Sequence, residues 1–124
     1  MIHVKATIRG EPDVPPFTKV FDYDEEIFFS SARIIEEKIQ RKMKVNANEA
    51  LTAFSAYVVE AIRAGRTDSD IQDGASKILS VETVMIGVPE TLRIITFEAA
   101  IDSRATRKFS LIQPILAGKY TLVG

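Results

Sequence analysis

The sequence predicts an α+β fold, a group of helices with a small antiparallel sheet. Helical periodicity runs through residues 24–90, whereas residues 92–113 alternate with period two on both sides of a turn, which is typical of a β-hairpin. Residues 2–8 alternate in the same way, so we expect a further strand that pairs with the hairpin and covers an edge otherwise free to aggregate. Helices and strands segregated along a chain indicate an α+β fold.

The chain has the length of one domain. Its 124 residues suffice to bury roughly two thirds of the unfolded surface. We expect a single domain over residues 1–124, with 1–18 as an added N-terminal strand and proline-rich connector. The helical part follows at 24–90, the hairpin at 92–113 and a tail at 114–124.

The composition excludes several classes of function. A net charge of −1 does not favour a nucleic-acid partner, which needs a clustered basic excess. Apolar runs stay far below ~20 residues, so we expect no membrane span. Cysteine is absent, which fits a cytoplasmic protein, and the start of the chain lacks the layout of a secretory signal.

The first half of the chain predicts a strand and then a helix. Residues 17–22 form either a second short strand or simply the approach to the helix. Asp22 or Asp24 can cap that helix, which we expect to run to about Met43. Its predicted inner face consists of Ile27, Phe28, Ser31, Ile34, Ile35, Ile39 and Met43.

A nearly all-apolar helix from Ala47 to Ala64 is the predicted centre of the fold. Asn46 and Glu49 have the spacing of a capping box, and Gly65 provides the stop. Two adjacent apolar seams leave a narrow polar strip, on which we expect Val59 to be exposed. The seams consist of Ala50, Ala53, Tyr57, Ala61 and Ala64, and of Leu51, Phe54, Val58 and Ile62.

Three shorter elements complete the prediction. Thr67 caps a helix from Asp68 to Leu79, whose buried set is Ile71, Ala75, Ile78 and Leu79. Ser80 caps a short turn over residues 81–86, which Gly87 and Pro89 close. Residues 120–123 can form one more strand after the hairpin.

The residues offer little catalytic chemistry. His3 is the one histidine, and we expect it on the polar face of the first strand as an ordinary surface histidine. Carboxylates gather at predicted helix starts, where capping and the helix dipole account for them. No phosphate-cradling glycine loop is present. We therefore expect no catalytic residue, no cofactor-binding residue and no metal ligand in this chain.

Several short motifs, in order and at close spacing, resemble the gamma, or small, subunit of microbial urease over roughly residues 29–115. The motifs are Lys44-Val45-Asn46-Ala47-Asn48-Glu49-Ala50, Ser55-Ala56 with Glu60, Arg63-Ala64-Gly65-Arg66-Thr67, Ile78-Leu79, Val84-Met85-Ile86-Gly87-Val88-Pro89-Glu90, Glu98-Ala99 and Pro114-Ile115. The family usually has an acidic residue where Ile86 stands. It also begins close to the first helix, whereas this chain adds about fifteen residues with strand character.

The resemblance implies a non-catalytic structural subunit of a urease-type, nickel-dependent urea hydrolase. The nickel pair of urease needs several imidazoles and a carboxylate-type bridge, which a chain with one histidine cannot furnish. In the family those ligands belong to the large subunit, so nickel is expected only through such a partner.

The partners that the resemblance implies are other copies of the chain, in a trimer-type homo-oligomer, and urease beta- or alpha-type subunits. We expect Val59 on the central helix, and Ile86 and Val88 in the turn, as possible interface residues. The alternative is a small enzyme or ligand-binding protein of the same fold, with a site at a subunit interface.

Overall fold

The computed structural model describes residues 2–10, 15–21 and 25–115. In this part of the chain four strands and four helices follow the predicted α+β arrangement. In order they are β1 (Ile2–Arg9), β2 (Phe17–Phe21), α1 (Glu25–Gln40), α2 (Ala47–Arg63), α3 (Asp68–Ala75), α4 (Val88–Thr91), β3 (Ile94–Ile101) and β4 (Arg107–Ile112). Within the described residues, every helix is too short or too polar to span a bilayer.

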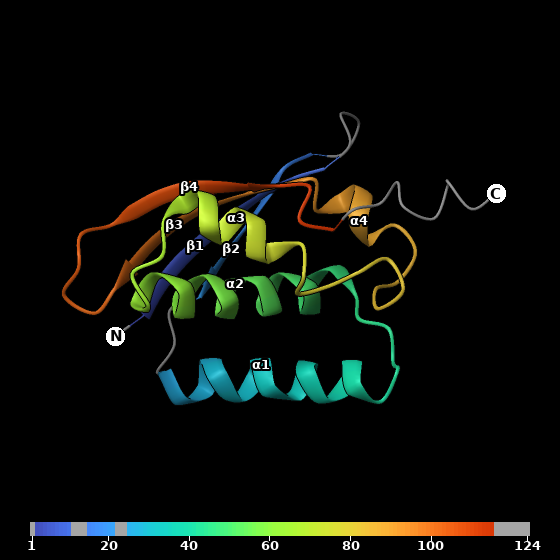
Figure 1. Ribbon diagram of the computed structural model, residues 1–124. Helices are drawn as coiled ribbons and strands as arrows, with labels where there is room; N and C mark the ends of the chain where they lie inside the picture. Colours follow the sequence, from blue (N-terminus) through green and yellow to red (C-terminus); the bar gives the residue numbers. More distant parts are fainter. Residues whose placement is uncertain (1, 11–14, 22–24, 116–124) are drawn as a thin grey trace.

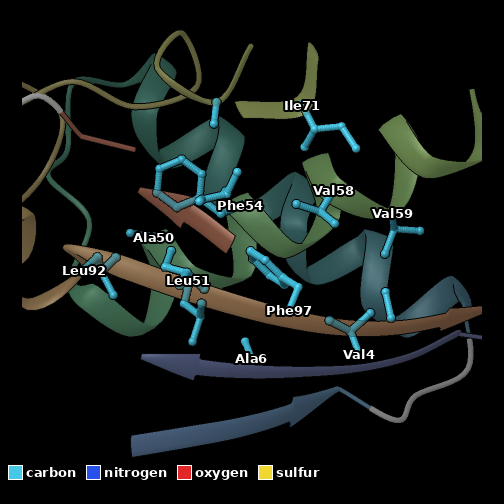
Figure 2. Packing of buried hydrophobic residues seen from close by; sticks show 14 of the residues in the cluster. Val4, Ala6, Ala50, Leu51, Phe54, Val58, Val59, Ile71, Leu92 and Phe97 are labelled. Carbon is cyan, nitrogen blue, oxygen red and sulfur yellow. The ribbon is translucent and has the colours of Figure 1, made fainter. Parts of the chain in front are cut away.

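The elements stack in layers, with α2 in the middle. One side of α2 faces the sheet and the other side faces α1, while α3 lies beside β4 (Figure 1). The apolar residues of α2 meet those of the inner sheet face, and Figure 2 shows Leu51, Phe54 and Val58 in one cluster with Phe97. The core therefore lies between the sheet and its central helix.

The sheet is antiparallel, with the order β2-β1-β3-β4. β1 pairs with β3 over its whole length, from Ile2 opposite Ile101 to Arg9 opposite Ile94, which confirms that the N-terminal strand joins the hairpin. Residues 17–21 form a true strand against β1, and this settles the question that the sequence left open. Side chains at even positions of β1 are buried and those at odd positions face away from the helices.

The boundaries of α2 follow the predicted capping chemistry. Asn46 Oδ1 accepts a hydrogen bond from Glu49 N at 2.8 Å, and a Glu49 carboxylate oxygen accepts one from Asn46 N at 3.0 Å. Gly65 has a φ of 76°, the left-handed conformation that glycine adopts at little cost. Thr67 Oγ1 accepts from Asp70 N and so caps α3.

Two arginines of the hairpin cover the C-terminal end of α2. Arg104 donates from Nη1 to Ile62 O at 2.5 Å, and Arg107 donates to Arg66 O at 3.2 Å. Cations are stabilised near a helix C-terminus, because the last carbonyl groups have no partner within the helix. The hairpin is therefore attached to the central helix by charge as well as by apolar packing.

The predicted inner face of the first helix is partly wrong. Phe28 and Ile35 are buried, but Ser31 is exposed and Ile34 is 66% exposed. Met43 is 51% exposed because α1 ends at Gln40 and Lys42 adopts a φ of 62°, which takes the following residue off the helix face. The proposed caps Asp22 and Asp24, and the possible strand at residues 120–123, lie outside the described residues.

The segment between α2 and the hairpin also differs from the prediction. α3 ends at Ala75 rather than Leu79, although Ile71, Ala75 and Leu79 are buried as expected. Residues 81–83 form a turn within the range predicted for one. The short helix α4, which begins at Val88, was not predicted; Gly87 with a φ of 93° precedes it, and Pro89 suits its first turn.

Candidate interaction surface

Two segments that are far apart in the sequence meet at one end of the molecule. Val45 and Val84 form an isolated parallel bridge, with Val45 N donating to Thr83 O at 3.0 Å and Met85 N donating to Val45 O at 2.9 Å. Both valines are buried. The α1–α2 connection and the loop before α4 therefore lie side by side (Figure 1).

Three exposed apolar side chains lie in the two segments joined by this bridge, and we call this group the bridge patch. Met43, Met85 and Ile86 are 51%, 44% and 102% exposed. Exposed lysines flank the patch at Lys42 and Lys44, and the exposed carboxylate Glu82 comes from the other segment. Exposed apolar groups with charges of both signs around them are typical of association surfaces.

The expected exposure of Val59 is wrong. Val59 is fully buried and lies in the same cluster as Val4 and Phe97 (Figure 2). The polar strip of α2 is narrower than its sequence indicates, because the sheet and α1 cover opposite sides of this helix. Even Thr52 is only 8% exposed.

The other two predicted contact residues lie in different environments. Val88, the first residue of α4, is 4% exposed, since its short helix packs against α2. Ile86 is fully exposed, and its role as a contact residue remains a prediction. Sequence reasoning missed the exposure of Met43 and Met85, which lie in two segments joined only by the long-range bridge between Val45 and Val84.

The described residues do not converge on a catalytic arrangement. His3 is exposed on the outer face of β1, as expected. Asp68, Asp70 and Asp73 are exposed around α3, and Asp68 pairs with Arg107. Among the residues that the structure describes, no group of three or more histidine, aspartate and glutamate side chains is placed to hold a metal ion.

The shifted pKa values have structural causes. The Lys38 ammonium, which donates to both Glu49 oxygens at 2.9 and 2.8 Å, lowers the pKa of Glu49. Hydrogen bonds from Arg63 lower the pKa of Asp102. Burial raises the pKa of Tyr57, whose hydroxyl donates to Ile71 O at 2.8 Å. Each of these three groups contacts another element of the fold. Both carboxyl groups have lowered pKa values, whereas a carboxyl group kept neutral for catalysis would have a raised one.

A groove of about 860 Å³ runs between α1 and α2. Small and aromatic side chains form its floor, among them Ala53, Ala56 and Phe29, so part of the small-residue seam of α2 faces solvent here rather than another helix. Charges of both signs surround it, and Arg63 lies over the Phe29 ring at 6.0 Å. Its lining also includes Lys77 and Ile78, which follow α3.

Comparison with known proteins decides the family. The family model described as "Urease, gamma subunit" matches residues 20–115, which is well over half of the chain. The chain belongs to the urease gamma subunit family. Relatives include the urease subunit gamma of Halalkalibacterium halodurans, 37% identical over 76 residues, which are 60% of this chain and 76% of the relative. The urease subunit gamma of Shewanella halifaxensis is 29% identical over 93 residues, or 75% and 92% of the two chains.

The urease gamma match maps onto the structure with a clear boundary. It begins at Val20, within β2, and includes all four helices, β3, β4 and the bridge patch. β1 and most of β2 precede it. The N-terminal strand therefore lies before the matched region, although it pairs with β3 over its whole length.

Proposed function

We propose that this chain is a non-catalytic structural subunit of a urease-type assembly in the cytoplasm. The observation that carries this proposal is the family match over residues 20–115, which spans the whole helical part and the hairpin. Relatives that bear the name urease subunit gamma are similar over most of their length. The partners are urease beta- or alpha-type subunits and further copies of the chain.

Nickel belongs to a partner in this proposal. A nickel pair needs several imidazole ligands, and the whole sequence contains one histidine and no cysteine. His3 is exposed on the outer face of β1, whereas the exposed carboxylates Asp68, Asp70 and Asp73 lie around α3. The contribution of the chain is then to hold other subunits in place.

The bridge patch is the surface that best suits contact between copies. It combines the exposed side chains of Met43, Met85 and Ile86 with lysines on one segment and Glu82 on the other. In a closed ring the lysines of one copy can meet the carboxylate of the next, while the apolar side chains are buried between them.

A substitution at Ile86 tests this contact. Ile86→Asp places a charge in the proposed interface, and we expect the trimer measured by light scattering to dissociate to monomer, because an unpaired buried charge is costly. Ile112→Asp is the matched control, since Ile112 is also exposed, at 60%, but belongs to β4 rather than to either segment of the bridge.

The control variant should keep the mass of the wild type. A wild-type chain that remains monomeric at tens of micromolar would contradict self-association. A failure of the purified chain to bind urease beta- and alpha-type subunits in co-purification would contradict the assembly itself.

The groove between α1 and α2 favours a second candidate function, the binding of a small ligand at a subunit interface. Its volume of about 860 Å³ falls within the range of ligand pockets. Ala56→Trp would fill its floor. If the groove binds a ligand, this variant should lose the rise in melting temperature that the ligand gives to the wild type, and an unchanged rise would exclude the groove.

A further inference from the structure

The sheet has two outer strands, and each is a potential pairing site for a second copy of the chain. β2 and β4 are the ends of the order β2-β1-β3-β4. An outer strand presents backbone N–H and C=O groups that can pair with another chain, so proteins close or protect such edges. In this structure the two edges differ in the contacts that cover them.

Side chains of α3 close the edge at β4. Gln72 acts like a neighbouring strand, because its Nε2 donates to Ile112 O at 3.0 Å and its Oε1 accepts from Ile112 N at 2.8 Å. At the other end of β4, Arg107 binds Arg66 O and the carboxylate of Asp68. Both ends of the strand are thus attached to α3 and the turn before it.

The edge at β2 has different surroundings from the edge at β4. β1 is the main neighbour of this five-residue strand. Its apolar side chains at Phe17 and Val20 are 43% and 46% exposed, which makes the strand attractive to another copy. Lys19 points to the helix side of the sheet, where its Nζ donates to Asn48 Oδ1 at 2.6 Å. Burial lowers the pKa of Lys19.

If the β2 strands of two copies pair along their full length, Lys19 lies at the centre of the pair. In an antiparallel pair around a twofold axis, all five residues of β2 find a partner only when the axis passes through the third residue, which is Lys19. The two Lys19 side chains then lie directly opposite each other, about 5 Å apart at Cβ. Registers centred on Thr18 or Val20 pair only three residues.

We infer that Lys19 prevents the β2 edges of two copies from pairing, so that neither edge of the sheet serves contact between copies. Like charges directly opposite each other destabilise a strand pair, and the partly buried site weakens screening by solvent. A central, inward-pointing lysine on a short outer strand is a recognised protection against edge-to-edge association. The inference stands whether or not the chain joins a urease-type assembly.

Substitutions at Lys19 test the inference in the full chain. Lys19→Val removes the charge, and we expect sedimentation equilibrium to show an additional, larger species over the concentration range used for the wild type. The pairing should tighten by about fivefold when the like charges are removed. Amide exchange at residues 17–21 should slow in the larger species, which locates the new contact at β2.

A charge swap gives the second test. Lys19→Glu alone should keep the mass of the wild type, because two glutamates then face each other. An equimolar mixture of wild type and Lys19→Glu should form the larger species, since Lys19 of one copy now faces a carboxylate of the other.

The control is Lys5→Val, which changes the net charge equally but lies on β1, inside the sheet. The inference is overturned if Lys19→Val and the mixture both sediment as the wild type, if exchange at residues 17–21 is unchanged, or if Lys5→Val associates as strongly.

Discussion

Glu49 shows how one side chain joins two helices. Its carboxylate accepts hydrogen bonds from Asn46 N, which closes the capping box of α2, and from Lys38 on α1. The pKa of Glu49 is lowered, chiefly by the hydrogen bond from Lys38. The capping box was predictable from the spacing Asn46-Glu49, whereas the contact with Lys38 requires the packing of α1 on α2.

The contribution of Glu49 depends on pH. A carboxylate whose pKa is lower in the folded state stabilises the fold fully above its ordinary value of 4.5, and this stabilisation is lost as pH falls through the lowered folded value. Glu49→Gln keeps an oxygen that can accept from Asn46 N but loses the ion pair with Lys38, so it should cost up to about 1 kcal/mol at pH 7. The difference from the wild type should vanish in acid, as measured by urea denaturation.

The matched control is Glu82→Gln, which removes an exposed carboxylate from the loop before α4. It should change the free energy of unfolding by less than about 0.5 kcal/mol at either pH. An equal loss for Glu49→Gln at pH 7 and in acid would show that its charge has no part in the stability.

Gly74 and Tyr57 form a second pair whose coupling can be measured. A Cβ at position 74 would lie 2.2 Å from the Tyr57 hydroxyl oxygen, which is held by its hydrogen bond to Ile71 O. Glycine in a helix ordinarily costs about 1 kcal/mol relative to alanine. The close contact with Tyr57 explains why glycine stands here within α3.

Gly74→Ala should therefore have opposite effects in two backgrounds. In the wild type we expect it to destabilise the fold by about 1–2 kcal/mol, because Tyr57 must move and lose its hydrogen bond. In a Tyr57→Ala background it should stabilise the fold by up to about 1 kcal/mol through helix propensity. Equal effects in both backgrounds, from thermal or urea unfolding, would rule out the contact.

At the scale of elements, the sequence correctly predicted the helices and strands for which periodicity and the residues at their ends indicate the same structure. β1, α2, the hairpin and the class of fold all follow from local patterns and are confirmed. The end of α1 did not follow and α4 was not predicted, because Lys42 and Gly87 adopt positive φ values that periodicity does not encode. β2 was ambiguous, since a five-residue strand becomes stable only through its pairing with β1.

The N-terminal strand is an inner strand of the sheet. β1 pairs with β2 on one side and β3 on the other. Beyond its end, Gly10 lies so close to α4 that a Cβ there would be 2.8 Å from Thr91 O, a backbone atom that cannot easily move. β1 and Gly10, which precede the urease gamma match, are therefore packed into the fold.

This position predicts slow amide exchange in β1. The amides of residues 2–8 should exchange about as slowly as those of β3, because opening them requires the sheet to come apart. Native-state hydrogen exchange read by NMR gives the comparison directly. Rapid exchange across residues 2–8, with β3 protected, would mean that the strand does not belong to the stable sheet in solution.

At the scale of the whole molecule, the candidate surface was harder to predict than the fold. Val59 looked exposed in the sequence because its neighbours on one side are polar, yet the layers on both sides of α2 bury it. The bridge patch depends on the long-range contact of Val45 with Val84, which local patterns cannot reveal. Only the exposure of Ile86 was predictable, because it is a large apolar residue beside Gly87 in a turn.

The central claim is that this member of the urease gamma family folds and associates but holds no reactive metal itself. The measurement that tests it most directly is nickel binding to the purified chain by equilibrium dialysis, followed by a urea hydrolysis assay on the same sample. We expect no tight nickel binding and no release of ammonia. Tight uptake of one nickel ion per chain, or urea hydrolysis by the chain alone, would contradict the claim.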